Sequence, residues 1–230
     1  MPERAPLEYV IANLGTPAEA SEQGVRAFLR EFLGDPMVVE YPRWFWIPLL
    51  NGVILRKRPV RIAKLYASIW QPGGSPLRVQ TESLAAALQA AAPEGTWVSS
   101  AYRYGAPNIA ERLERAFQRA ERVVFTSLFP QRTASSSGSA DAEARAVAHR
   151  LGASDRLELR PLDPTHGDYV GALADRILAS QSQFSGGRAE HLLVSFHSIP
   201  AGVDRREGRR YTSDCEATYE ALLERLDWDP

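Results

Sequence analysis

His197 ends an apolar run and is the residue of this sequence best placed to do chemistry. Residues 191–200 read HLLVSFHSIP, so hydrophobic side chains continue to Phe196, the histidine follows, and Pro200 closes the turn. A neutral imidazole can accept a proton near neutral pH or bind a metal ion. The same position suits a structural histidine held by hydrogen bonds, and the spacing leaves both interpretations open.

A serine-rich stretch follows another apolar run. Residues 129–139 read FPQRTASSSGS and lead into a helical pattern. Backbone N–H groups at a helix N-terminus, together with small hydroxyls, suit a carboxylate or a phosphate. The hydroxyls concerned are those of Ser135, Ser136 and Ser137. The alternative is a simple turn in which Ser139 caps the helix.

An arginine between two tyrosines is the third candidate. Residues 102–105 read YRYG, which predicts either an anion clamp, with Arg103 on an aromatic wall formed by the two tyrosines, or an ordinary surface turn. The glycine patterns of P-loops and of dinucleotide-binding turns do not occur, so nothing specific favours nucleotide binding.

An apolar segment with basic neighbours is the sharpest anomaly of the sequence. Residues 44–59 read WFWIPLLNGVILRKRP, with Arg43 before them. This pattern is typical of an anchor at a membrane interface, and it also suits the wall of a pocket for a flat apolar ligand. A core helix with basic residues at its C-terminal end is the plain alternative. The side chains expected at this membrane or pocket lip are Trp44, Phe45, Trp46, Leu49 and Leu50.

Strand-like and helical patterns alternate along the chain and indicate an α/β fold. The strand-like runs are residues 9–15, 97–105, 122–130, 157–162 and 191–198. Such alternation predicts a doubly wound parallel sheet, in which ligands bind beyond the carboxyl ends of the strands. We expect a first domain at residues 1–186, with the apolar insertion at 41–76, and the start of a second domain at 187–230.

The composition limits the classes of function. The 230 residues include 27 basic and 28 acidic side chains, so a net charge of −1 gives no general attraction to nucleic acid. Cys215 is the single cysteine, so one chain cannot build a Cys-ligated iron–sulfur cluster. The first residues have no long apolar core, which predicts no secretory signal and a cytoplasmic location, at most peripheral to a membrane.

Six motifs, in order, resemble blocks of the ferrochelatases, the enzymes that insert ferrous iron into a porphyrin to make haem. They are NLGTP (13–17), FLGDPMVVEYPRWFWIPLLNGVILRKRP (32–59), YASIWQPGGSPL (66–77), YRYGAPNI (102–109), FPQRTASSSGS (129–139) and LLVSFHSIP (192–200). The resemblance implies two Rossmann-like halves with a porphyrin cleft between them. It implies ferrous iron as a substrate, with no tightly bound cofactor.

The resemblance also implies roles for single residues. His197 matches the family's active-site histidine, which takes pyrrole protons or helps to position the metal. The insertion matches an apolar lip over the cleft mouth that also meets a membrane. The positions that match the porphyrin cleft are Leu14, Tyr66, Ser75, Arg103 and Tyr104.

The sequence departs from the family pattern in its last part. The family's final third, with a glutamate block that faces the histidine, has no counterpart, so we expect an incomplete second half that an oligomer or a partner chain covers. Asp204, Glu207 and Asp214 are candidate replacements, each expected to be solvated. The family's GDPY is here GRRY, at residues 208–211. A catalytically silent porphyrin-binding protein is therefore the main alternative, and a cobalt chelatase of the same fold is a further one.

Overall fold

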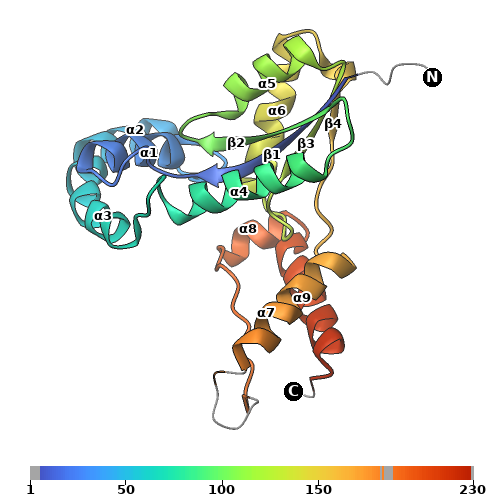
Figure 1. The fold of residues 1–230 in the computed structure, drawn as a ribbon. Helices are drawn as coiled ribbons and strands as arrows, with labels where there is room; N and C mark the ends of the chain where they lie inside the picture. Colours follow the sequence, from blue (N-terminus) through green and yellow to red (C-terminus); the bar gives the residue numbers. More distant parts are fainter. Residues whose placement is uncertain (1–5, 182, 184–188, 229–230) are drawn as a thin grey trace. The chain divides into compact units, whose positions relative to one another are not determined.

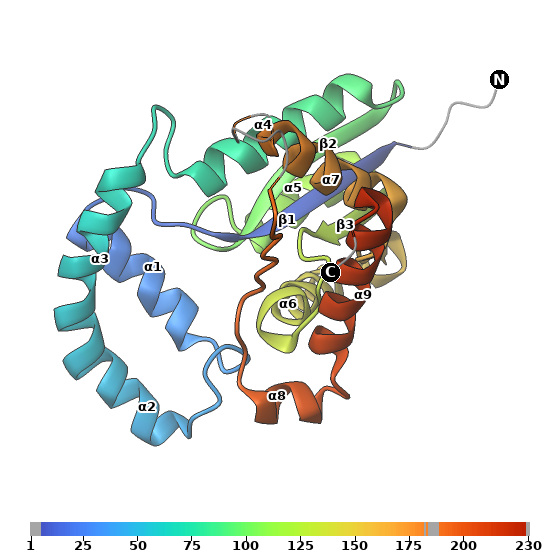
Figure 2. The same ribbon diagram turned by 90° about the horizontal axis from the view of Figure 1, so that it is seen from below.

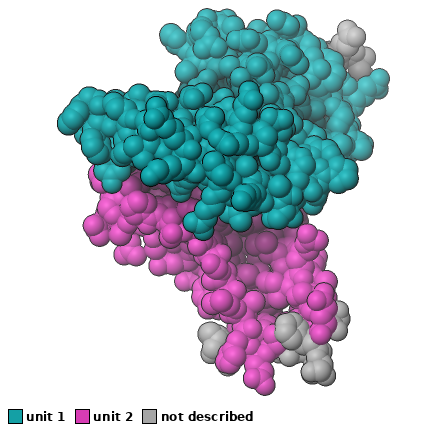
Figure 3. Space-filling model, turned by 90° about the vertical axis from the view of Figure 1, so that its left-hand side faces the viewer, with its two compact units in different colours: residues 1–128, 134–160 teal, residues 129–133, 161–230 magenta. Residues whose placement is uncertain are grey.

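The computed structural model describes residues 6–181, 183 and 189–228. The chain divides into two compact units, shown in different colours in Figure 3. Unit 1 contains residues 1–128 and 134–160, and unit 2 contains residues 129–133 and 161–230. The predicted boundary after residue 186 lies outside the described residues. The units separate earlier along the chain, because the helix that precedes this point packs with the last helix of unit 2.

A four-stranded parallel sheet forms the centre of unit 1, in the order β2-β1-β3-β4. The strands are β1 (Leu7–Gly15), β2 (Thr96–Tyr104), β3 (Arg122–Ser127) and β4 (Leu157–Leu159). In the register, Tyr9 of β1 lies between Val98 of β2 and Val124 of β3. The first four strands expected from the sequence are thus confirmed, as is the α/β class with parallel strands.

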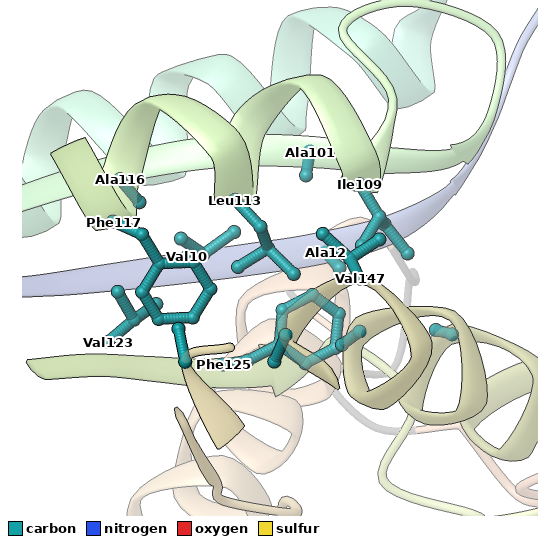
Figure 4. Close-up of a cluster of buried hydrophobic side chains, with 14 of the residues drawn as sticks. Val10, Ala12, Ala101, Ile109, Leu113, Ala116, Phe117, Val123, Phe125 and Val147 are labelled. Atoms are coloured by element: carbon teal, nitrogen blue, oxygen red, sulfur yellow. The ribbon is translucent and has the colours of Figure 1, made fainter. Parts of the chain in front are cut away.

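Helices cover both faces of this sheet (Figure 1). Neighbouring residues of a strand point to opposite faces. Val10 and Ala12 of β1 therefore pack in the core cluster that includes α5 (Ile109–Arg119) and α6 (Ser139–Arg150). Figure 4 shows this cluster, with Leu113 and Phe125 at its centre. On the other face, the Nδ2 atom of Asn13 donates a hydrogen bond to Thr81 of α4 (Pro76–Ala91), at 3.0 Å.

The apolar insertion forms a separate helical layer in unit 1. It consists of α2 (Arg43–Leu49), the π-helical turn η1 (Leu50–Ile54) and α3 (Leu55–Ile69). These helices pack with α1 (Glu22–Gly34) in a second apolar cluster, which also includes Leu14 and Tyr104 from the ends of β1 and β2. The layer therefore lies at the carboxyl ends of the strands, where an α/β sheet places its ligands. A short 3-10 turn, η3 (Ser154–Arg156), leads into β4.

Unit 2 is helical in its described residues. It holds α7 (Gly167–Gln181), α8 (Ala201–Arg206) and α9 (Arg210–Leu226), with a small core of Val170, Ala174 and Leu222. The strand expected at residues 191–198 is wrong for the described chain, since this segment is extended but belongs to no sheet. An extended segment becomes a β-strand only by pairing, and no described residue of the unit offers a partner strand.

Candidate functional site

His197 lies in unit 2, on the extended segment between α7 and α8, and its side chain is exposed. Half-buried Leu192, Val194 and Phe196 alternate with exposed residues along this segment. The alternation turns Phe196 towards α9 and presents the imidazole to solvent. The hydroxyl of Tyr211 donates a hydrogen bond to the His197 carbonyl oxygen at 2.7 Å. Unit 2 therefore holds an accessible imidazole on an anchored backbone.

A hollow of about 400 Å³ lies between this segment and α9. Its walls include Phe196, Tyr211 and Cys215. Burial, and then the neighbouring Cys215, raises the pKa of Tyr211 to about 12. Burial also raises the pKa of the Cys215 thiol. Both groups are therefore neutral at neutral pH, and the buried cysteine acts as a small apolar packing residue.

Asp204 and Asp214, two of the three acidic residues expected to be solvated, are buried, so this expectation is wrong for them. Asp204 is 7% exposed and accepts hydrogen bonds from the N–H and the hydroxyl of Thr212. Asp214 is 9% exposed and accepts from the N–H and the Nε of Arg132, at 3.1 and 3.2 Å. Both carboxylates are occupied by donors of their own unit. Glu207 is half-buried.

Arg103 and Tyr104 lie in unit 1, in a polar cluster at the carboxyl end of β2. The Oδ2 atom of Asp35 accepts hydrogen bonds from Nη2 of Arg103 at 2.8 Å and from the hydroxyls of Tyr104 and Ser139, each at 2.7 Å. The Nε of Arg103 donates to Ser139 at 2.7 Å, and its Nη1 lies 3.8 Å from the Glu143 carboxylate. The guanidinium of the predicted anion clamp is thus held by carboxylates of the protein itself.

The cluster fixes the charges of its members. Burial raises the pKa of Asp35, but hydrogen bonds from Ser139, Tyr104 and the Met37 N–H, with the charge of Arg103, outweigh burial and lower the pKa below its usual value. Burial raises the pKa of Tyr104 well above its usual range, against the Ser139 hydrogen bond and together with Asp35. At neutral pH, Asp35 is therefore ionised and Tyr104 is neutral.

A cavity of about 900 Å³ opens beside this cluster within unit 1. Its polar walls include Arg103, Asp35, Glu31 of α1, and Ser139 and Glu143 of α6. Sequence reasoning missed Asp35 and Glu143. The available signal for Asp35 was a carboxylate directly after the C-terminal glycine of an amphipathic helix, in FLGDP.

Leu14, Tyr66 and Ser75 do not line this cavity. Leu14 and Tyr66 are half-buried and pack against the apolar cluster that contains Tyr104, so the fold brings these three together. Burial raises the pKa of Tyr66 and keeps its phenol neutral. Ser75 is 1% exposed, and its hydroxyl accepts a hydrogen bond from the Arg78 N–H at 3.2 Å as the N-cap of α4. A ligand contact of Ser75 stays a prediction.

The serine-rich stretch forms the π-helical turn η2 (Ala134–Gly138), which runs directly into α6. Ser137 is buried, and Ser135 and Ser136 are half-buried. Ser139 is the first residue of α6 and not its cap, since the cap position is Gly138, and its hydroxyl donates to Asp35. The capping alternative is therefore wrong, and a carboxylate-binding role of Ser135, Ser136 and Ser137 stays a prediction.

The predicted lip separates into a buried and an exposed part. Trp46 is 8% exposed and Leu50 is 1% exposed, and the indole of Trp46 donates to the Leu33 carbonyl at 2.7 Å. These two residues belong to the core and not to a lip, because successive helical residues point in different directions. Leu49 is half-buried against the same core. Trp44, 81% exposed, and Phe45, 48% exposed, form the outward part of α2.

Two classes of feature are absent from the described part of the chain. No three His, Cys, Asp or Glu side chains among these residues come together as a set that could hold a metal ion. None of the helices described has the length and apolar character needed to cross a membrane.

Comparison with known proteins identifies the family. A family model described as ferrochelatase matches residues 9–230. The coproporphyrin III ferrochelatase of Symbiobacterium thermophilum is 36% identical over 221 residues, which cover 94% of this chain and 68% of that relative. The ferrochelatase of Methylibium petroleiphilum is 40% identical over 228 residues, 96% of this chain and 61% of the relative. The ferrochelatase of Aromatoleum aromaticum is 38% identical over 235 residues and is covered to 63%.

The chain thus spans about two thirds, or somewhat less, of the length of these relatives. The match extends through both units, from β1 to the end of α9, and includes all six motifs. The chain belongs to the ferrochelatase family.

Proposed function

We propose that this chain inserts ferrous iron into a porphyrin, a step of haem biosynthesis, and that His197 is the proton acceptor or metal contact. The observation that carries the proposal is the family match over residues 9–230. Iron is here a substrate and not a resident cofactor, so the chain needs no closed set of metal ligands. The substrate is a porphyrin, either protoporphyrin or coproporphyrin.

The reaction requires two pyrrole N–H protons to leave as the dication enters the ring. A ring nitrogen of His197 accepts one proton at a time and passes it to solvent, which the exposure of the imidazole supports. The Tyr211 hydrogen bond to the His197 carbonyl holds the backbone from which the imidazole projects. Asp204 and Asp214 take no part, because each is occupied by donors of unit 2.

Leu14, Tyr66 and Tyr104 are proposed to contact the porphyrin ring. Their neutral, largely apolar cluster suits a flat macrocycle. Arg103 acts through Asp35, Ser139 and Tyr104, and so positions the end of β2. The hydroxyls of Ser135, Ser136 and Ser137, on the turn before α6, are proposed to hold a carboxylate of the substrate.

The second candidate function is a porphyrin-binding protein that is silent by itself. One observation favours it: the Asp204 and Asp214 carboxylates, which follow His197 in the sequence, already accept hydrogen bonds within unit 2. Such a protein would bind porphyrin and insert no metal.

An anaerobic titration separates the two candidates. Porphyrin is added first and zinc second, and the shift in metalloporphyrin fluorescence reports insertion. His197→Ala is expected to slow insertion by about 10²-fold or more, as for loss of a general base. His191→Ala, an exposed histidine on the same segment, is the matched control and is expected to behave as the parent. Saturable binding without insertion by the parent selects the silent binder, and equal rates in both variants remove His197 from the mechanism.

We also propose a cytoplasmic protein that touches a membrane through α2. Trp44 and Phe45 are exposed beside Arg43, a combination that suits a lipid interface. Co-sedimentation with anionic vesicles is expected to fall for Trp44→Ala/Phe45→Ala. Leu84→Ala/Leu88→Ala, which removes two exposed apolar residues of α4, is the matched control.

A second copy or a partner chain is proposed to cover unit 2. Leu193 is 92% exposed on a segment with apolar alternation and no sheet partner among the described residues. Sedimentation equilibrium of the chain alone is expected to show self-association that Leu193→Asp weakens. If the chain were a monomer at all concentrations, a second copy would be excluded as the cover of unit 2, and a different partner chain would remain.

A further inference from the structure

Four arginines crowd the turn between α8 and α9. Residues 204–211 read DRREGRRY, so Arg205, Arg206, Arg209 and Arg210 lie within six positions of a chain whose net charge is −1. This local charge is not used by the function proposed above.

The fold holds the two arginine pairs on one tight turn. Gly208 and Arg209 both have positive φ, +69° and +59°, and α9 begins at the next residue. The Arg209 N–H donates to the Asp204 carbonyl at 2.7 Å, and the Asp204 carboxylate accepts from Thr212 of α9. The end of α8 is thereby tied to the start of α9, so both pairs flank the same corner of unit 2.

Three of these four arginines have no side-chain partner among the described residues. Arg205, Arg209 and Arg210 are exposed, and their guanidinium groups make no hydrogen bond or ion pair with another described residue. The Asp204 carboxylate of α8 is buried and accepts hydrogen bonds from Thr212. The first turn of α9 also has no acidic residue, although anions are favoured there. Like charges close together lower the stability of the fold. An anion from outside the chain that binds here would offset this repulsion.

The arginine turn is linked to His197 through Tyr211. Tyr211 follows Arg210 directly, and its hydroxyl bonds the His197 carbonyl at 2.7 Å. Successive Cα atoms are about 3.8 Å apart, so Arg209 and Arg210 lie one to two such steps from the residue that holds the His197 backbone. Figure 2 shows the extended segment entering α8 and the chain returning from α8 into α9.

We propose that Arg205, Arg209 and Arg210 bind carboxylates at the rim of the porphyrin, and that this chain therefore prefers a porphyrin with four carboxylates, coproporphyrin, to one with two, protoporphyrin. The proposal rests on the proposed function, since it needs the ring to lie at His197. Guanidinium forks pair with carboxylates through two parallel hydrogen bonds, and each additional carboxylate adds a partner.

The test measures binding without metal, by porphyrin fluorescence, for both porphyrins. Arg209→Gln/Arg210→Gln is compared with Arg176→Gln/Arg225→Gln, which removes the same charge from exposed positions of α7 and α9. Matching melting curves of the two variants show that both fold. An exposed ion pair contributes little binding energy. We therefore expect Arg209→Gln/Arg210→Gln to bind coproporphyrin roughly five-fold more weakly than the parent, and protoporphyrin less than about two-fold more weakly. The control is expected to bind as the parent, and the parent's preference is expected to shrink with salt.

Two results would overturn the proposal in different ways. If the parent binds both porphyrins and the arginine variant matches the control, the carboxylate site is wrong while the proposed function stands. If the parent binds neither porphyrin, the proposed function fails and the carboxylate site fails with it.

Discussion

Replacing Asp35 tests whether the polar cluster of unit 1 is held together by one carboxylate. Asp35→Ala removes the acceptor of hydrogen bonds from Arg103, Tyr104, Ser139 and the Met37 N–H. Removing one partner of a buried ion pair costs about 3–5 kcal/mol. The Arg103 side chain is 21% exposed, so water replaces part of the lost pairing. We therefore expect the free energy of unfolding to fall by about 3 kcal/mol.

The measurement is urea unfolding followed by tryptophan fluorescence. Asp155→Ala, an exposed aspartate of the same unit, is the control and is expected to cost less than about 0.5 kcal/mol. Tyr104→Phe combined with Asp35→Ala is expected to cost less than the sum of the two single changes, by about 1 kcal/mol, because both remove the same hydrogen bond. Equal stability of Asp35→Ala and Asp155→Ala would refute the reasoning.

The pH dependence gives the same test in another form. The folded pKa of Asp35 is depressed, so its contribution to stability is complete above the unfolded pKa of about 3.9 and is lost as pH falls through the lower, folded value. The difference in unfolding free energy between the parent and Asp35→Asn should therefore shrink as the pH falls below about 4. If this difference in unfolding free energy were constant down to pH 2, the neighbours of Asp35 would not lower its pKa.

Three further outcomes follow from particular contacts. The fold raises the pKa of Tyr104, so its contribution to the free energy of unfolding is complete below the usual tyrosine pKa of about 10 and is lost at higher pH. In a pH series, Tyr104→Phe should therefore lose less stability at alkaline pH than the parent. Trp46→Ala should cost about 3–5 kcal/mol and Trp44→Ala less than about 0.5 kcal/mol in thermal melts, and equal losses would contradict the two environments. Gly15→Ala should destabilise strongly, since φ is +105° and a Cβ would lie 1.8 Å from the Tyr104 carbonyl oxygen; an unchanged melting temperature would contradict this geometry.

The sheet of unit 1 could be predicted because its signals are local. The apolar runs that became β1 and β3 are bounded by turn residues, and the periodicity of α1 shows within a single helix. The segment at 191–198 has the same local signal. Its state depends on a partner strand, which no local pattern can supply, and the prediction was therefore wrong for the described chain.

The lip shows a second limit. The apolar run correctly located the insertion, but the sequence pattern did not distinguish buried Trp46 from exposed Trp44, two positions earlier. Which indole is buried depends on where α2 meets the end of α1, where the Leu33 carbonyl accepts the Trp46 hydrogen bond. Contacts of this kind join segments through the tertiary fold, so they become visible only when α1 and α2 are packed together.

Arginines illustrate why residue type alone does not define a binding site. Arg103 lies between tyrosines and was equally suited to an external or an internal carboxylate. In the fold, Arg103 pairs with the carboxylate of Asp35, a residue distant in sequence, and so with an internal partner. Arg209 and Arg210 have similar chemistry, but the Asp204 carboxylate accepts from Thr212, and the two guanidinium groups are exposed and have no partner among the described residues. An arginine is a candidate for ligand recognition when the folded chain leaves its guanidinium group unpaired, and by that criterion the turn between α8 and α9 is a stronger candidate for a carboxylate site than the YRYG motif.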